Sequence, residues 1–317
     1  MRLLVTGIAG FIGSHLAERL VARGHDITGL DNFDAFYPRA VKERNLARLD
    51  RSRVVEGDIL DAGAVDRILG SARFDGVVHL AALAGVSPSL SAPARYVRVN
   101  VEGTMTLVES MVRHGVRQMV FASSSSVYGA NTSVPFDEDD RVDDPMSPYA
   151  ASKRGAELAL KAVVHTTGIS VAALRFFTVF GPRQRPDMAI HKFTRAIDHG
   201  EPVLLRGTGA TSRDYTYIDD VIDGTAAAVE RVAENPSGFR AYNLGGTHAT
   251  RLDDLIARIG AALGKTPRIE VVPELRGDVQ HTLANVARAG AELGYAPKIG
   301  LDEGLRRFVE WYRAAGA

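Results

Sequence analysis

The chain has 317 residues, and its 38 basic and 38 acidic side chains leave no formal net charge at pH 7. This balance argues against a polyanion-binding surface, so no nucleic-acid partner is expected. The absence of cysteine excludes disulfides, thiol catalysis and cysteine metal sites, and no metal is expected. No apolar run is long enough to span a membrane, and no signal peptide precedes the first strand, so we expect a cytoplasmic protein.

Residues 2–6 predict a short buried strand, and residues 11–23 show the apolar spacing of a helix. Between them, Gly7 permits a tight turn, Gly10 allows a pyrophosphate to approach the backbone, and Gly13 lets the helix pack on the strand. The spacing is one residue longer than the G-x-G-x-x-G fingerprint. The strand–turn–helix context nevertheless predicts a dinucleotide site at the helix N-terminus.

Asp31 ends the second predicted strand, over residues 26–30, about 20 residues beyond the glycines. A carboxylate there can accept hydrogen bonds from both ribose hydroxyls and would repel a 2′-phosphate, so NAD is favoured over NADP. The alternative is an ordinary loop aspartate. A polar helix is expected over residues 39–49. A third strand, over residues 53–59, contains Asp58, which could meet the adenine amino group.

A fourth strand, over residues 75–82, ends in small residues, as a bound cofactor requires. Within it, His79 is expected to be a hydrogen-bonded core residue rather than a catalytic one. A long helix over 93–115 and a fifth strand over 116–123 follow. Strand and helix thus alternate at intervals of about 25 residues, which predicts an α/β fold with a doubly wound parallel sheet of the Rossmann type.

The fifth strand ends in four consecutive serines, Ser123 to Ser126. Ligands of open α/β sheets bind beyond the carboxyl ends of the strands, where these hydroxyls could meet a reacting oxygen. The alternative is a flexible polar loop. The acidic segment 131–146, with its charge run at 137–140, is interpreted as a solvated connection.

Ser147 is a natural N-cap and Pro148 a natural first residue for the next helix, over 147–167. Tyr149 then lies in the first turn, with Lys153 four residues later on the same face. The ammonium and the positive helix end should both lower the pKa of the Tyr149 phenol and make it a candidate acid or base. Alternatively, Tyr149 is a packing residue and Lys153 a solvated one.

Beyond residue 170 the predicted helices and strands become shorter, and they alternate less regularly. We expect a strand at 171–175, a loop at 176–187, a helix at 188–199, a strand at 203–206, a helix entered through 213–220, a strand at 242–245, and helices at 251–263, 285–293 and 301–313 with a strand at 269–272. The predicted division is a NAD-binding domain over 1–174, to which segments near 215–245 return, and a smaller substrate lobe over 175–317.

Taken together, the glycine turn, Asp31, the serine cluster and Tyr149-x-x-x-Lys153 resemble the extended short-chain dehydrogenase/reductase family, and within it the NAD-dependent nucleotide-sugar epimerases. The resemblance extends over nearly the whole chain. It implies that Ser124 binds the sugar O4, that Tyr149 takes the O4 proton, and that Lys153 lowers the tyrosine pKa and binds the nicotinamide ribose. The NAD-binding residues expected from the motif and the resemblance are Gly7, Gly10, Phe11, Ile12, Gly13, Asp31, Asn32, Asp58, Ile59, Leu80, Ala81, Ala82, Asn100, Ser123, Tyr149, Lys153 and Phe176.

The resemblance also bears on the substrate. Related 4,6-dehydratases carry an Asp-Glu pair where this chain has Ser125 and Ser126, which favours an epimerase. Segment 175–189 resembles that of UDP-glucuronate 4-epimerases, in which Thr178 and Arg185 would bind the sugar carboxylate. Ser87 stands where many of these enzymes have arginine, so a UDP-glucose or UDP-N-acetylglucosamine 4-epimerase, possibly promiscuous, is the alternative. A binding protein without catalysis is disfavoured by the retained catalytic trio.

The expected substrate-binding residues are Gly85, Val86, Ser124, Ser125, Ser126, Tyr149, Thr178, Arg185, Met188, Ala189, Arg213, Arg276 and Asp278. Arg213 and Arg276 would bind the diphosphate, and Asp278 the uridine ribose. Arg183 and Arg185 could instead bind phosphates or acidic neighbours, and Arg213 could pair with a nearby aspartate. Family members are usually homodimers joined through helices that match 93–114 and 148–166, so a homodimer is expected.

Overall fold

The structure is a computed structural model, and it describes residues 1–234, 236, 238–273 and 279–316. Its main element is a seven-stranded sheet in the order β10-β6-β5-β4-β1-β2-β3, and every neighbouring pair of strands is parallel. The strands are β1 (Arg2–Thr6), β2 (Asp26–Asp31), β3 (Val54–Glu56), β4 (Gly76–His79), β5 (Gln118–Ser124), β6 (Ser170–Phe176) and β10 (Phe239–Leu244). The predicted doubly wound α/β sheet is therefore confirmed.

Helices cover both faces of this sheet. One layer contains α3 (Ala62–Gly70), α6 (Gly103–Arg113) and α7 (Pro148–Thr167), and the other contains α1 (Phe11–Ala22), α9 (Ile218–Glu234) and α11 (Ala287–Leu293). Alternate residues of one strand enter different cores, because successive side chains of a strand point to opposite faces. In β1, Leu4 packs with the α3 and α6 side, whereas Leu3 and Val5 pack with the α1 and α9 side.

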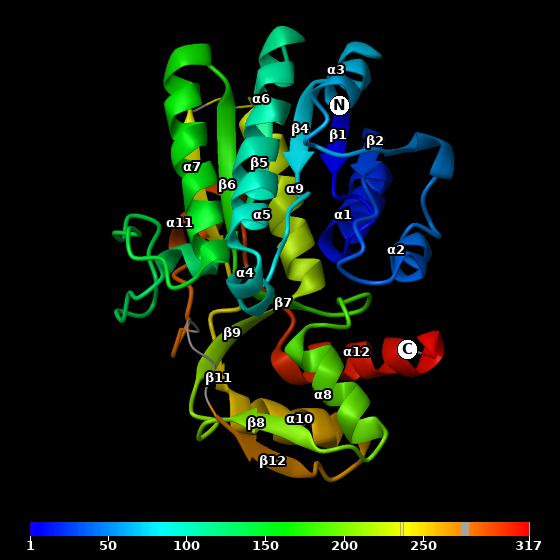
Figure 1. The fold of residues 1–317 in the computed structure, drawn as a ribbon, viewed down its shortest axis with the longest axis vertical. Coiled ribbons are helices and arrows are strands. Elements are labelled where there is room, and N and C mark those ends of the chain that lie inside the picture. The colour runs from blue at the N-terminus through cyan, green and yellow to red at the C-terminus, as the bar shows by residue number, and fades with distance from the viewer. Residues whose placement is uncertain (235, 237, 274–278, 317) are drawn as a thin grey trace.

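A smaller part of the chain lies beyond the carboxyl ends of the strands, in the lower half of Figure 1. It contains the two-stranded pair β12-β8 and the three-stranded sheet β11-β9-β7. Its elements are β7 (Thr178–Phe180), α8 (Ala189–Asp198), β8 (Val203–Arg206), β9 (Ser212–Tyr217), β11 (Ala249–Arg251), α10 (Leu252–Leu263), β12 (Ile269–Val272) and α12 (Leu301–Ala315). The boundary between two domains at residue 174 stays a prediction.

Several elements differ from the sequence-based expectations. The long helix expected over 93–115 is built from α5 (Pro93–Val97), a π-helical turn over Arg98–Glu102, and α6. The expected loop 176–187 contains the short strand β7, and the approach to α9 is the strand β9. The polar helix expected over residues 39–49 is the shorter α2 (Arg39–Asn45). Additional short elements are α4 (Val86–Ser91) and 3₁₀ turns at Arg51–Arg53 and Ser125–Tyr128.

The interpretation of segment 131–146 as a solvated connection is wrong in part. Phe136 and Val142 are buried in a small core with Tyr128 and Phe177, and the Phe136 ring stacks on that of Tyr128. The carboxylate of Glu138 is buried as well, and it accepts a hydrogen bond of 2.8 Å from a backbone N–H of β10. Long-range packing that no local pattern reveals thus buries part of an acidic segment.

Candidate functional site

A cavity of about 810 Å³ lies at the carboxyl edge of the parallel sheet. Its walls come from the ends of β1, β2, β4, β5 and β6, the start of α7, and the segment that follows β7. Ligands of open α/β folds bind at this edge of the sheet. The cavity is therefore the candidate active site.

The glycine turn forms one wall of this cavity. Gly7 has a φ of +73°, and a Cβ there would lie 2.7 Å from the backbone nitrogen of Ala81. A Cβ on Gly13 would lie 2.1 Å from the Gly7 carbonyl oxygen, so side chains are excluded at both positions. Helix α1 begins beside the cavity, and its N-cap, Gly10, has no side chain that could cap the helix. An uncapped helix N-terminus facing a cavity suits an anionic diphosphate.

Asp31 lies at the end of β2, where the sequence places it. Its carboxylate accepts hydrogen bonds from the backbone N–H groups of Ala9, at 3.0 Å, and Phe33, at 2.8 Å. The ammonium of Lys42, from α2, lies 3.7 Å from the same carboxylate and also lines the cavity. A buried carboxylate fixed by these donors keeps acceptor capacity for ribose hydroxyls. The residues of this wall thus fit the adenosine half of NAD.

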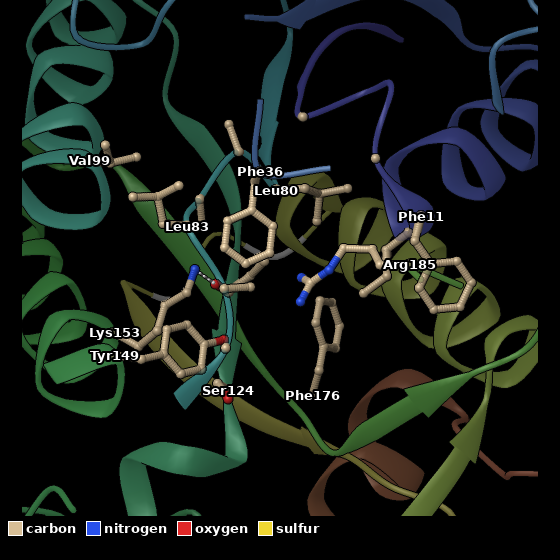
Figure 2. A pocket seen from close by; sticks show the side chains of 18 of the residues that line it. Phe11, Phe36, Leu80, Leu83, Val99, Ser124, Tyr149, Lys153, Phe176 and Arg185 are labelled. Atoms are coloured by element: carbon tan, nitrogen blue, oxygen red, sulfur yellow. Dashed lines mark hydrogen bonds between the residues drawn. The ribbon is translucent and has the colours of Figure 1, made fainter. Parts of the chain in front are cut away.

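Tyr149 and Ser124 meet at the opposite wall. Helix α7 begins at Pro148 because the Ser147 hydroxyl accepts a hydrogen bond of 3.2 Å from a backbone N–H of its first turn. Tyr149 lies beside Ser124, and both side chains line the cavity (Figure 2). Ser124 in turn accepts hydrogen bonds from the backbone N–H and hydroxyl of Ser126. The serine cluster is therefore an ordered turn rather than a flexible loop.

Lys153 is buried and hydrogen-bonded to the end of β5 rather than solvated. The Lys153 ammonium donates a hydrogen bond of 2.7 Å to the Ala122 carbonyl oxygen, drawn as a dashed line in Figure 2. Burial raises the pKa of Tyr149, and the hydrogen bond with Ser124 and the charge of Arg185 only partly oppose this. The expected net lowering of the Tyr149 pKa is therefore not found, because burial outweighs the charges that oppose it.

Arg185 faces these residues from the segment after β7, and Figure 2 shows its guanidinium beside Phe36 and Phe176. The guanidinium lies 5.2 Å from the Phe36 ring centre and donates two hydrogen bonds, of 2.9 and 2.8 Å, to the Asp187 carboxylate. Arg183 points elsewhere and pairs with Glu18 of α1. Both arginines therefore have acidic neighbours, but of the two, Arg185 is the one that lines the cavity.

Most other residues expected at the site also line the cavity. These are Phe11, Ile12, Asn32, Asp58, Ile59, Leu80, Ala81, Ala82, Gly85, Val86, Ser123, Ser125, Thr178, Met188 and Arg213. Arg213 donates to the backbone oxygens of Ser212 and Gln280. Arg276 and Asp278 lie outside the described residues.

Two expected contact residues, Asn100 and Ala189, do not line the cavity. Asn100 is buried, accepts a hydrogen bond from the Leu83 N–H and donates to the Leu83 carbonyl oxygen. Ala189 is the first residue of α8. His79 is a core residue hydrogen-bonded to Thr6 and Thr104, as expected.

Sequence reasoning missed several residues of the cavity wall. Lys42, Phe36 and Tyr37 come from the segment after β2, and Asp187 follows β7. The adjacent aromatic residues Phe36 and Tyr37 were the available signal in the sequence. Lys42 lies in a predicted polar helix, where an ammonium is expected to be solvated, so its burial beside Asp31 depends on the tertiary fold.

The parallel sheet, the glycine turn and the Ser124–Tyr149 pair define a dinucleotide-binding enzyme of the Rossmann type. The sequence matches the family described as NAD dependent epimerase/dehydratase over residues 3–245. A probable UDP-glucuronate 4-epimerase of Rhizobium meliloti is 38% identical over 98% of this chain and 97% of its own length. The chain therefore belongs to the NAD-dependent epimerase/dehydratase family.

Solved structures agree with this assignment. The UDP-glucuronic acid 4-epimerase of Bacillus cereus, in complex with UDP-glucuronic acid and NAD, superposes with a TM-score of 0.92 at 33% identity, covering 99% of this chain and 100% of the other. The UDP-glucose 4-epimerase of Thermotoga maritima, with UDP-glucose, has a TM-score of 0.90 at 32% identity, with both chains covered completely. The cofactor of the family is NAD, as the sequence predicts.

Proposed function

We propose that the protein catalyses the NAD-dependent 4-epimerisation of a UDP-sugar, with UDP-glucuronate and UDP-galacturonate as the principal pair. The observation that carries the proposal is the close pair of Tyr149 and Ser124, which faces the Arg185 guanidinium across one cavity. An acid–base pair and a cation within one cavity suit a sugar that has a reacting hydroxyl at C4 and a carboxylate at C6.

Several residues of the cavity have assigned parts in this reaction. The glycine turn and Asp31 hold NAD, which when bound accepts hydride from the sugar C4 and returns it. Ser124 orients the O4 hydroxyl, and the Tyr149 oxygen takes the O4 proton and returns it to O4 when hydride is delivered to the opposite face of C4. The 4-keto sugar forms between these two proton transfers. Epimerisation then requires the sugar to turn within the cavity.

The C6 carboxylate is assigned to Arg185 and Thr178, with Ser125 and Ser126 as further donors. Arg185 can form two parallel hydrogen bonds to a carboxylate, and in the structure it already binds the Asp187 carboxylate in this way. Ser125 and Ser126 carry hydroxyls rather than the acid and base that elimination at C5 and C6 would need. The proposed reaction therefore ends with the return of hydride to C4.

A second candidate is the epimerisation of UDP-glucose or UDP-N-acetylglucosamine, and the Arg185–Asp187 pair favours it. Asp187 compensates the charge of Arg185, so a neutral sugar would not leave an unpaired cation in the cavity. Ser87, which also lines the cavity, adds no charge to it. The likeness to the UDP-glucose epimerase of Thermotoga maritima is consistent with this alternative.

The proposal extends to assembly and location. Leu90, Val97 and Leu158 are exposed apolar side chains on α4, α5 and α7, and these helices contact one another. We propose that they contribute to a homodimer interface, as expected from the resemblance. Over the described residues no helix is long and apolar enough to cross a membrane. A cytoplasmic homodimer that binds no nucleic acid remains the proposed state.

The test is NMR of the purified protein with UDP-glucuronate and, separately, with UDP-glucose, without added reductant. Formation of UDP-galacturonate alone would support the carboxylate site, and equal turnover of both sugars would support the broader hexose epimerase. The control is Tyr149→Phe, which should abolish turnover while it leaves UDP-sugar binding intact. Comparable activity in that variant would exclude the assigned mechanism.

A further inference from the structure

A completely buried carboxylate lies directly behind the catalytic residues. Glu157 belongs to α7 and follows Lys153 by one helical turn. Its Oε1 accepts hydrogen bonds from the Ser123 hydroxyl, at 2.6 Å, and from Arg175 Nε, at 3.0 Å. Its Oε2 accepts from Arg175 Nη2, at 3.0 Å, and from Arg154 Nη1, at 3.1 Å. Four donors thus satisfy one carboxylate in the protein interior.

These contacts join α7 to the two strands that end at the reaction site. Ser123 and Arg175 are partners in the register between β5 and β6. Ser123 stands between Ala122, whose carbonyl accepts from Lys153, and Ser124, which binds Tyr149. A shift of Glu157 would therefore move the acceptor of Lys153 and the partner of Tyr149 together.

The network continues away from the cavity. Arg175 Nη1 donates to the Tyr128 hydroxyl at 3.1 Å, and Tyr128 donates to the Asn243 side chain of β10 at 2.6 Å. Removing two charges from water is costly, and a buried ion pair is often no more stabilising than well-packed apolar residues. A stability role alone therefore explains the Glu157–Arg175 pair poorly, whereas a geometric role at the adjacent site explains it well.

We propose that Glu157 is a positioning residue for the epimerisation: it fixes Ser124 and the Ala122 carbonyl relative to α7, and it places a carboxylate charge behind the Lys153 ammonium. This inference rests on the proposed function, which gives Tyr149 and Ser124 their roles, and on the ribose-binding role that the family resemblance implies for Lys153. Glu157 does not line the cavity. It acts through Ser123 and Lys153 rather than on the substrate.

The charges around Lys153 support this role. Burial lowers the pKa of Lys153 to about 7, and the Glu157 carboxylate opposes that shift. The other groups that face the ammonium are Tyr149 on the same helix, His79 of β4, whose burial lowers its pKa to about 3, and the Phe121 ring of β5, at 5.1 Å. Among these groups, Glu157 supplies the negative charge at neutral pH, which favours the ammonium form of Lys153.

The experiment compares Glu157→Gln with Glu138→Gln in the NAD-loaded protein. Glu138 is the matched control, because it is also buried and near Arg175, but it contacts neither Ser123 nor Lys153. In Glu157→Gln we expect kcat to fall about tenfold or more and the alkaline limb of the kcat/KM profile to move down by roughly one pH unit. KM for the UDP-sugar should change little. Glu138→Gln should keep the wild-type pH profile.

A lower melting temperature with an unchanged pH profile and kcat would show a purely structural role and overturn the inference. If Glu157→Gln does not fold, the double variant Glu157→Gln/Arg175→Gln removes both buried charges, and the same shift of the alkaline limb is expected. If the wild type turns over no UDP-sugar, the proposed function fails separately. In that case the NAD affinity, measured by calorimetry at several pH values, tests the inference. The affinity should begin to fall at a lower pH in Glu157→Gln than in the wild type. Identical curves would overturn the inference.

Discussion

The Lys42 ammonium lies 3.7 Å from the Asp31 carboxylate, and both side chains are buried in the cavity wall. Asp31 ends β2, whereas Lys42 belongs to α2, so the contact joins two elements separated by a loop. The Lys42 ammonium also lies 5.0 Å from the centre of the Tyr37 ring. Asp31, the acceptor proposed for the adenosine ribose, is therefore held in place by two backbone N–H groups and by the Lys42 ammonium.

Asp31→Ala should weaken NAD affinity about tenfold or more, because hydrogen bonds to a charged carboxylate contribute about 1.5–3 kcal/mol. Isothermal titration calorimetry with NAD measures the change. Glu56→Gln is the control, since Glu56 is an exposed carboxylate on the neighbouring strand and pairs with Arg39. An unchanged affinity in Asp31→Ala would remove Asp31 from the cofactor site.

Arg185→Gln should raise KM for UDP-glucuronate by about tenfold to a hundredfold, because it removes the charged donor assigned to the carboxylate. KM for UDP-glucose should change much less. Arg183→Gln is the control, because Arg183 pairs with Glu18 outside the cavity. Equal effects of Arg185→Gln on both sugars would contradict the carboxylate assignment.

Loss of carbon dioxide is a second readout of the same site. A 4-keto uronate is a β-keto acid, which decarboxylates when its carboxylate turns perpendicular to the ketone. Donors that hold the carboxylate away from that geometry would protect the intermediate. Carbon dioxide and a pentose product should therefore appear with Arg185→Gln or Thr178→Ala and UDP-glucuronate, but not with the wild type.

Acid should destabilise the fold through His15. Burial and the charge of Arg183 lower the pKa of His15 to about 4, from an ordinary value of 6.5. Between these two values the unfolded chain binds more protons at this position, so stability falls as the pH falls. The slope is up to about 1.4 kcal/mol per pH unit. Urea unfolding of the wild type between pH 7 and pH 4 measures it.

His15→Gln is the matched variant for this measurement. A glutamine amide can replace the hydrogen bond of 2.9 Å between His15 Nε2 and the Pro182 carbonyl oxygen, but it does not titrate. The slope of stability against pH should therefore be smaller in this variant over the same range. An identical slope would show that the acid sensitivity comes from other groups.

Leu158→Glu should convert a dimer into monomers, because it places a charge in the proposed apolar contact between copies of α7. Analytical ultracentrifugation measures the mass in solution. Leu204→Glu is the matched control, since the two leucines are about equally exposed, at 50% and 49%, but Leu204 lies on β8 in the smaller part of the chain. A monomeric wild type would refute the proposed assembly.

The sequence by itself determined the features that arise within a few residues. The glycine turn follows from a strand, three glycines and a helix in immediate succession, and Ser147 and Pro148 set the start of α7. Tyr149 and Lys153 share a helix face because four residues make about one turn. Regular alternation of strands and helices predicted the parallel sheet, since short crossovers leave few other topologies.

The tertiary structure decided which side chains meet across the molecule. Lys42 beside Asp31, Arg185 beside Asp187 and Phe36, and Glu138 beneath β10 depend on elements that are separate in the chain. Burial also decided the pKa of Tyr149, against the expectation from its helix. Local spacing specifies which residues are neighbours on one helix or strand. The desolvation of a side chain and its pairing with distant residues depend instead on all the elements that pack around that side chain.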